Sequence, residues 1–390
     1  LYLVAANDLV SLFIGFELMS LSIYSLAGVW RGDARAGEGA MKYFVLGSFS
    51  SAFLLYGLAL LYGVTGTIYL DKMADVAAGG SAAGGLALAA MGLLIVGFAF
   101  KVGAVPFHAW IPDAYQGAPA AVTGFMAVTV KAAAFAVFIR ILHVLGLLGS
   151  LTPGSQLAQG ALWVLAVLTM IVGNLAAVAQ TKIQRLLGYS AIAHSGYVFV
   201  GLAAAAHPHV DGGVAQAFAA AQDAAAGALY YLVGYAAMTI GAFAVLAQVR
   251  RDGKPAEDID DLAGLAQERP GAALAMTIFL VSLIGIPPTA GFMGKLWLFR
   301  AAVNAGLTPL VVIAVLTTAV SVYYYLRVVV VMYMSEPAPA SSPTGAPLAE
   351  PSYGGRFATA LAAAAVLLIG MFPSGTLESA TKGVAALFAK

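Results

Sequence analysis

The sequence predicts an all-α membrane protein that crosses the bilayer many times, and three observations carry this prediction. Of its 390 residues, 61% are hydrophobic and 9% are charged, and the mean hydropathy is +0.91, which is too apolar for an ordinary soluble domain. Apolar stretches recur that reach the roughly 20 residues needed to cross a bilayer. Because lipid offers no partners to backbone amides, such stretches fold as helices, and abundant Gly and Ala allow those helices to pack closely.

Ten apolar stretches are expected to span the membrane, at about residues 8–30, 37–64, 86–107, 119–145, 159–178, 184–206, 225–249, 273–299, 309–333 and 356–373. Leu1–Ala6 is expected to be the end of a further helix, so that the chain is a fragment. We predict one transmembrane domain over 1–390, with a first, N-terminally truncated inverted repeat at 1–145 and a second at 159–333. A Pro/Ser-rich connector at 336–351 leads to a detached C-terminal helix at 356–373.

Two stretches contain helix-breaking residues at apolar depth. The first break is Lys101–Pro106 in the third stretch, and the second is Gly285–Gly294 in the eighth. Proline removes a backbone donor and opens the hydrogen-bond ladder of a helix. An offset of five helices reverses the direction of the chain, as inverted repeats require, and interrupted helices at matching places indicate an ion path near the midplane. The alternative is a pair of kinks that only help packing.

Loop charges predict the orientation. Loops that follow odd-numbered stretches hold nine basic residues, and the opposite loops with the C-terminus hold four, which places the first side in the cytoplasm. The nine are Arg31, Arg35, Lys182, Arg185, Arg250, Arg251, Lys254, Arg269 and Arg356, and the four are Lys72, Arg300, Lys382 and Lys390.

Several classes of function are excluded by composition. The net charge of +1, with dispersed Lys and Arg, gives no basic field for nucleic acid. The absence of Cys excludes thiolate-held iron-sulfur clusters and Cys zinc sites, so any electron transfer is expected on other chains. No phosphate loop follows a strand, and no catalytic triad is evident, so we expect no covalent catalysis on this chain and no bound metal.

Charged residues inside the predicted helices are the candidate functional residues. A charge at the centre of a membrane helix costs roughly 2.5–3.5 kcal/mol on insertion scales, so each needs a reason. The candidates are Glu17, Lys42, Lys101, Lys131 and Lys295. Burial brings amines and carboxyls closer to proton exchange at neutral pH, and Glu17 beside a lysine can act as a switch. The alternative for each of the five is a place in a buried ion pair that only fixes helix register.

Two histidines are further relay candidates. His108 follows Lys101 by seven residues, which would place both on one helix face if Pro106 did not intervene, and His194 lies in the sixth stretch. A packing role is the alternative for both. Arg140 and Arg327 are expected to extend from helix ends to the membrane surface, and the run Tyr323–Tyr325 is expected to pack or to form an interface belt.

Three motifs carry a resemblance to a known family. The segment from Phe100 to Pro119, FKVGAVPFHAWIPDAYQGAP, resembles the signature of antiporter-like subunits of respiratory complex I and of multisubunit cation/proton antiporters. Its ending, DAYQGAP, resembles subunit N of NADH-quinone oxidoreductase in particular. The segments Gln180–Tyr197 and Gly285–Lys295 also match, and the resemblance covers essentially the whole chain.

The resemblance implies roles for individual residues. It makes Glu17 the glutamate of the family's fifth helix and Lys42 the lysine of its sixth. Lys101, Lys131 and Lys295 then match the lysines of the seventh, eighth and broken twelfth helices, with Glu17 gating Lys101, Lys131 connecting the halves and Lys295 near the exit.

The resemblance also implies a setting. It places the chain in the bacterial plasma (inner) membrane beside other complex I subunits, especially neighbouring antiporter-like ones. Redox-driven proton translocation would occur here, while FMN, the iron-sulfur clusters and quinone would be bound by partner subunits. Two alternatives stay open: a secondary cation/proton antiporter, and a scaffold subunit whose own lysines are idle.

Overall fold

The computed structural model describes residues 1–78, 84–149, 153–207, 213–251, 254–337, 348, 350 and 352–388. Its helices are α1 (Tyr2–Ala5), α2 (Leu9–Ala27), α3 (Ala34–Thr65), α4 (Leu70–Ala78), α5 (Gly85–Val102), α6 (Trp110–Gly117), α7 (Ala120–Val144), α8 (Pro153–Val178), α9 (Ile183–Ala206), α10 (Gly213–Gln248), α11 (Leu265–Glu268), α12 (Pro270–Ile284), α13 (Ala290–Asn304), α14 (Thr308–Met334), α15 (Tyr353–Met371) and α16 (Pro373–Phe388). A short 3-10 helix, η2, spans Ile259–Leu262, and β1 (Arg250–Arg251) pairs antiparallel with β2 (Lys254–Pro255).

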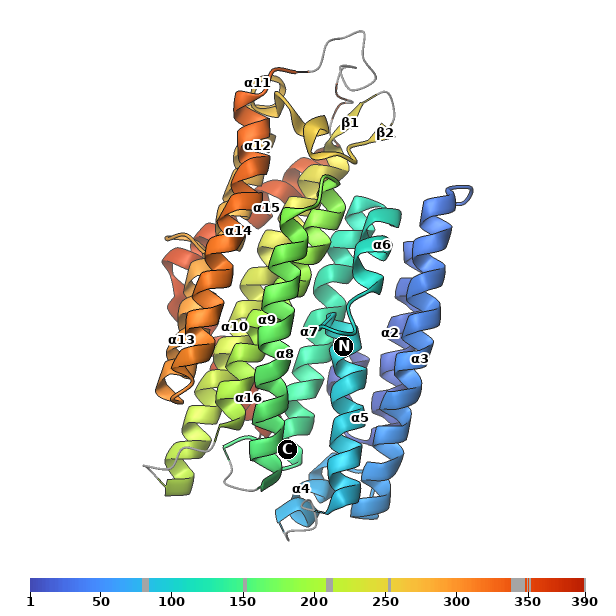
Figure 1. Ribbon diagram of the computed structural model, residues 1–390, viewed down its shortest axis with the longest axis vertical. Helices are drawn as coiled ribbons and strands as arrows, with labels where there is room; N and C mark the ends of the chain where they lie inside the picture. The colour runs from blue at the N-terminus through green and yellow to red at the C-terminus, as the bar shows by residue number, and fades with distance from the viewer. Residues whose placement is uncertain are drawn as a thin grey trace.

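The long helices run side by side along the longest axis of the molecule, as a membrane bundle requires (Figure 1). Within the described residues, nine helices are long and apolar enough to cross a bilayer, and they correspond to nine of the ten predicted stretches. The tenth, at 273–299, is divided into α12 and α13. The predicted all-α polytopic fold is therefore confirmed. The β1–β2 hairpin lies at one end of the bundle, called here the hairpin end, and α4 lies at the opposite end (Figure 1).

The first predicted break lies between α5 and α6. Helix α5 ends at Val102, and Gly103 adopts a left-handed conformation with φ of 72°, which glycine tolerates without a Cβ clash. A non-helical turn then runs to Ala109 before α6 begins, and its Val105–Pro106 peptide bond is cis.

The second predicted break lies between α12 and α13. Helix α12 ends at Ile284, and Gly285 is again left-handed, with φ of 92°. The chain turns through Ile286–Thr289 and re-enters a helix at Ala290. Both breaks thus follow from a glycine that closes one helix and a proline that delays the next. The boundaries of the two inverted repeats stay a prediction.

The C-terminal helix is not detached, contrary to expectation. Tyr230 on α10 donates its hydroxyl to the Ile369 carbonyl of α15 over 2.8 Å, and Gln248 donates to Thr359 over 3.0 Å. Small residues such as Gly370 make this close approach possible. Residues 338–347, 349 and 351 of the predicted connector lie outside the described residues. Helix α16, which the sequence analysis did not predict, follows α15 with Pro373 at its first position, where the missing N–H costs nothing.

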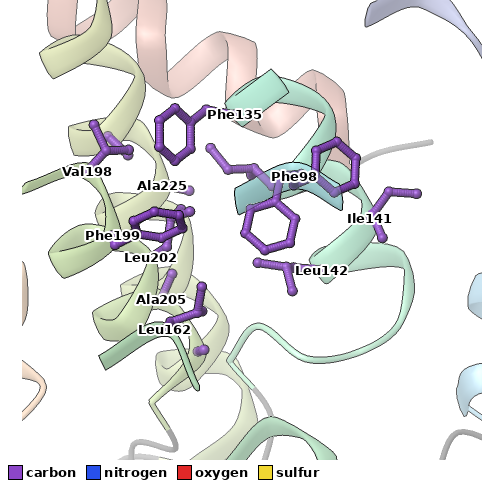
Figure 2. Packing of buried hydrophobic residues seen from close by; sticks show 14 of the residues in the cluster. Phe98, Phe135, Ile141, Leu142, Leu162, Val198, Phe199, Leu202, Ala205 and Ala225 are labelled. Atoms are coloured by element: carbon purple, nitrogen blue, oxygen red, sulfur yellow. The ribbon is translucent and has the colours of Figure 1, made fainter. Parts of the chain in front are cut away.

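Among the residues that the structure describes, buried apolar side chains form two separate cores. The first core lies toward the α4 end and includes Phe16, Phe98, Phe135, Leu162 and Phe199. Figure 2 shows part of it, where Phe98 and Phe135 face Phe199 and Leu202 across the space between helices. The second core lies toward the hairpin end and includes Tyr24, Met126, Ile192, Phe243 and Phe279. Dividing the apolar interior in this way leaves a layer between the cores for polar groups.

We expect Gly370→Ala to destabilise the fold. A Cβ at position 370 would lie 2.2 Å from the Pro288 carbonyl oxygen, so α15 would have to move away from the α12–α13 break. Overpacking of this kind costs about 1–3 kcal/mol, and the thermal unfolding midpoint of the purified protein should fall.

Gly354 on the same helix is the matched control, because a Cβ there meets nothing within 4 Å. Equal thermal unfolding midpoints for Gly370→Ala and Gly354→Ala would contradict the close packing of α15 against the α12–α13 break.

Candidate functional site

The polar layer between the two cores contains the buried candidate residues. Along α7, Lys131 lies between Val130 of the second core and Ala134 of the first, and along α9, His194 lies between Ile192 of the second core and Tyr197 of the first. The members of the layer with buried side chains are Ser20, Lys101, Lys131, Asn174, His194, Ser195, Lys295 and Thr317. Three lysines therefore occupy one level of the bundle, at 1–4% exposure.

Lys101 is held at the end of α5 by groups from α2. Its Nζ donates to Ser20 Oγ over 2.6 Å and to the Tyr24 hydroxyl over 3.0 Å. The rings of Phe16 and Tyr24 lie 4.8 and 5.2 Å from the same nitrogen. Aromatic faces attract a cation, so the site combines two oxygen acceptors with rings that exclude water.

Glu17 lies on the same helix as these acceptors but makes no ion pair with Lys101 or Lys42 within the described residues. Its Oε1 is buried and has no hydrogen-bond partner in the described part of the chain. An unsatisfied buried carboxylate oxygen is costly, which is consistent with a group that changes partner. The predicted gating of Lys101 by Glu17 stays a prediction.

Lys42 is not buried within the bundle, unlike the other three candidate lysines, and its relay role stays a prediction. Its side chain is 45% exposed and forms ion pairs with Glu38 at 2.6 Å and with Asp113 at 2.7 Å. The lysine lies in the third turn of α3, close to the hairpin end, where it reaches the carboxylate of α6.

His108 is separated from Lys101 by the first break. Helix α5 ends before Pro106, so the seven-residue spacing does not place the two side chains on one face. His108 is half-buried in the turn before α6, and its Nδ1 is buried without a hydrogen-bond partner among the described residues. Its relay role stays a prediction.

Lys131 and His194 lie in the middle of the layer. Lys131 Nζ donates to the Ala191 carbonyl on α9 and lies 5.4 Å from the centre of the Tyr235 ring. Ser195 Oγ lies within hydrogen-bonding distance of the same Ala191 carbonyl and, at 2.6 Å, of the Val102 carbonyl. Val102 follows Lys101, so one serine connects the two lysine sites.

His194 contacts hydroxyl groups on both of its ring nitrogens. Nδ1 lies 2.5 Å from the Tyr231 hydroxyl, and Nε2 lies 3.2 Å from that of Tyr325. An imidazole between two hydroxyls can accept a proton on one nitrogen and give it up from the other.

Lys295 lies at the second break. Its Nζ donates to the Ile284 carbonyl over 2.9 Å, to the Leu283 carbonyl over 3.3 Å and to Thr318 Oγ1 over 3.2 Å. The last carbonyls of a helix lack intrahelical partners and carry partial negative charge, so the end of α12 is a natural acceptor for an ammonium. The Tyr197 ring covers the cation at 4.3 Å.

A chain of hydroxyl and amide groups leads from Lys295 toward His194. Thr318 donates to the Tyr197 hydroxyl over 3.1 Å, and the Asn174 amide nitrogen donates to the same hydroxyl over 3.5 Å. The Tyr324 hydroxyl in turn donates to the Asn174 amide oxygen over 3.0 Å. The adjacent Tyr325 contacts His194. Sequence reasoning missed these residues and assigned the tyrosine run to packing. Only Tyr323 faces outward, at 60% exposure, and the usable signal was that hydroxyl side chains recur at the lysine level.

Arg140 does not extend to the membrane surface, contrary to expectation. It is 6% exposed and donates to the Ala6 carbonyl over 2.5 Å and to Asn7 Oδ1 over 2.6 Å. These acceptors end α1 and precede α2, so the guanidinium fixes the entry of α2 into the bundle. Arg327 donates to the Gln180 carbonyl over 3.3 Å.

A group of ion pairs lies at the hairpin end, above the layer. Asp113 accepts from Arg185 at 2.5 Å as well as from Lys42. Burial raises the pKa of Asp113, but hydrogen bonds from Lys42 and Arg185 outweigh it, and the net pKa lies below the usual value of 3.8. A second set joins Arg35 to Glu257 at 2.6 Å and Lys182 to Asp258 at 2.8 Å.

Within the described ranges, no cluster of three or more His, Asp or Glu residues could hold a metal ion. The fold and the site thus define a polytopic helical membrane protein with two broken helices and a row of buried lysines between apolar cores.

Comparison with known proteins gives the family. Residues 6–321 match the family model described as NADH:quinone oxidoreductase/Mrp antiporter, transmembrane. NADH-quinone oxidoreductase subunit N 1 of Sorangium cellulosum is 47% identical over 98% of this chain and 73% of its own length. The chain therefore belongs to the NADH-quinone oxidoreductase subunit N family, and the resemblance seen in the sequence is confirmed.

Solved structures agree with this assignment. A chain of respiratory complex I from Thermus thermophilus with bound aureothin matches with a TM-score of 0.78 and 36% identity, over 97% of this chain and 76% of its own. A chain of the Mrp complex from Dietzia sp. shares the fold, with a TM-score of 0.83 at 23% identity, over 98% of this chain and 74% of its own.

We expect Asp113→Asn to lower the thermal midpoint at neutral pH and to flatten its dependence on acid. A carboxyl whose folded-state pKa lies below its unfolded value stabilises the fold above the unfolded value, here 3.8, and loses this contribution as pH falls through the folded value. The difference between wild type and Asp113→Asn should therefore shrink below about pH 4. A difference that stays constant down to pH 2 would show that the carboxylate charge is not the stabilising feature.

Proposed function

We propose that this chain is a proton-translocating membrane subunit of NADH-quinone oxidoreductase in a bacterial inner membrane. Membership of the subunit N family supports assembly with the other subunits of complex I, including neighbouring antiporter-like ones. NADH oxidation and quinone reduction take place on those subunits, which hold FMN and the iron-sulfur clusters. This chain contributes the path for protons.

The observation that carries the proposal is the row of three buried lysines in one layer. Each ammonium costs several kcal/mol to hold in a lipid-embedded bundle, and each has an acceptor and an aromatic ring beside it. Such sites stabilise the cation enough to keep it, yet a neutral amine can occupy the same space. A chain of groups that gain and lose protons in place is what lateral proton transfer requires.

The proposed path begins at Lys101 and crosses the bundle. Glu17 on α2 gates Lys101, because α2 also carries the Ser20 and Tyr24 acceptors and any movement of this helix changes the surroundings of the ammonium. Lys131 receives the proton through the region of Ser195, which lies between the two lysine sites. His194 and the tyrosine hydroxyls then lead to Lys295.

The carbonyl acceptors of Lys295 favour its charged form. When Lys295 is charged, it neutralises the partial negative charge at the end of α12. Release of its proton leaves a neutral amine that can still donate to these carbonyls but no longer balances their partial negative charge, so the site favours rapid reprotonation from the chain of groups beside it. Helix α13 carries the lysine and α12 the carbonyls, and the break between them allows this distance to vary.

A scaffold function is the second candidate, and the same contacts favour it. Lys295 connects α12, α13 and α14 through Leu283, Ile284 and Thr318, as a register-fixing residue would. The two functions differ in what happens when the charge is removed while the shape is kept.

We expect Lys101→Met to abolish coupled pumping. Methionine keeps most of the side-chain volume but cannot carry a proton, so NADH-driven proton uptake by inverted membrane vesicles should fall about tenfold or more, together with coupled electron transfer to quinone. Assembly is checked by the size of the purified complex.

The control is Lys382→Ala, because Lys382 is exposed and pairs only with Glu378 one turn away among the described residues. Wild-type uptake by an assembled Lys101→Met complex would replace the relay by the scaffold function. Sodium-dependent transport by particles without NADH activity would favour an antiporter instead.

A further inference from the structure

Gly47, in the middle of α3, has an unusually close neighbour. A Cβ built at this position would lie 1.9 Å from the Tyr24 hydroxyl oxygen and 2.7 Å from the carbon that bears it. Glycine in a helix interior lowers helix stability by roughly 1 kcal/mol relative to alanine. A glycine in the middle of a long helix is therefore favourable only where the missing side chain leaves space that another group needs. Here the absence of a side chain leaves the volume that the Tyr24 hydroxyl occupies.

The Tyr24 ring is fixed by aromatic neighbours on its other sides. Tyr43 meets it edge-on with centroids 4.5 Å apart, and Phe44 lies 5.8 Å away. Tyr43 is itself stacked on Trp110 at 3.9 Å, with the planes 2° apart. Trp110 Nε1 donates to the Phe100 carbonyl over 3.0 Å, which ties this aromatic group to the residue before Lys101.

The hydroxyl that enters the space beside Gly47 is the one that accepts from Lys101 over 3.0 Å. Ser20, the other acceptor, donates its own hydrogen to the Phe16 carbonyl over 2.5 Å, so its hydroxyl is committed to the backbone of α2. A phenol hydroxyl both accepts and donates. Tyr24 is therefore the acceptor whose position depends on a second helix, α3, rather than on α2 alone.

We propose that Gly47 and Tyr24 are a positioning pair for Lys101. The missing side chain at Gly47 admits the Tyr24 hydroxyl, and the hydroxyl holds the Lys101 ammonium at the point where a proton enters the lateral path. The proposal rests on the proton-relay function and adds two residues to it. It makes the packing of α3 against α2 a determinant of proton transfer, although α3 supplies no hydrogen bond to Lys101 within the described residues.

The test compares Gly47→Ala, Tyr24→Phe and the double variant in the assembled complex. NADH-driven proton uptake, protons moved per NADH oxidised, and the pH profile of turnover are measured in inverted membrane vesicles. Each single variant should lose about ten- to a hundredfold in coupled uptake, because each removes one hydrogen bond to a charged group. The pH at which turnover falls by half should shift by the same amount in both.

The double variant gives the decisive result. If Gly47→Ala acts by displacing the hydroxyl, it has little left to remove once the hydroxyl is gone, so the double variant should lose no more than the worse single variant. Gly63→Ala is the matched control on the same helix, since a Cβ there meets nothing within 4 Å, and it should retain wild-type uptake and pH profile.

Three outcomes would overturn the proposal. They are wild-type uptake in both single variants, losses that multiply in the double variant, and an unshifted pH profile, which would make the effect one of packing. If Gly47→Ala fails to assemble, Tyr24→Phe decides alone, because it removes a single oxygen. Lys101→Met distinguishes failure of the positioning pair from failure of the relay. If Lys101→Met is inactive while Gly47→Ala and Tyr24→Phe are normal, only the positioning pair is refuted. If Lys101→Met is active, the relay is refuted as well.

Discussion

An ammonium group inside a membrane bundle must find its acceptors in the protein, and the architecture follows from this constraint. Lys295 uses the free carbonyls at the end of α12, which exist because Gly285 and the following prolines interrupt the helix. Lys101, at the end of α5, relies instead on hydroxyls from α2. At Lys295, the helix break and the lysine are therefore parts of one solution, because the break supplies the carbonyls that the ammonium needs.

The division of the apolar interior into two cores serves the same constraint. Each core is close-packed and holds the helices in register, as the aromatic contacts around Phe98 and Phe135 show (Figure 2). Between them, the polar layer concentrates hydroxyls, amides and amines at one level, where they satisfy one another. Spread along the helices, the same groups would leave isolated polar atoms in apolar surroundings, each with a desolvation cost.

Much of the fold could be predicted from the sequence because its signals are local. The length of the apolar stretches predicted the nine long helices, and the prolines and glycines near Lys101 and Lys295 predicted both helix breaks. The surroundings of Lys42 and Arg140 could not be predicted, because they depend on other helices: a lysine near a helix start finds Asp113, and an arginine near a helix end finds Ala6. The hydroxyl partners of the lysines were missed for the same reason, since the identity of a Ser, Thr or Tyr residue does not show which helix its hydroxyl will contact.

The packing of α15 against the second break affects how well the irregular backbone there is covered. At Pro288 and Thr289 the backbone leaves the helical ladder, and irregular backbone is not stable when it faces hydrocarbon. Gly370 lies so close to these atoms that α15 covers them, while the Tyr230 hydroxyl anchors the neighbouring Ile369 carbonyl. The last long helix thus shields the Pro288 carbonyl and the buried Thr289, while the side chains of Ile286, Pro287 and Pro288 remain exposed, so the chain itself encloses this structurally weak point only in part.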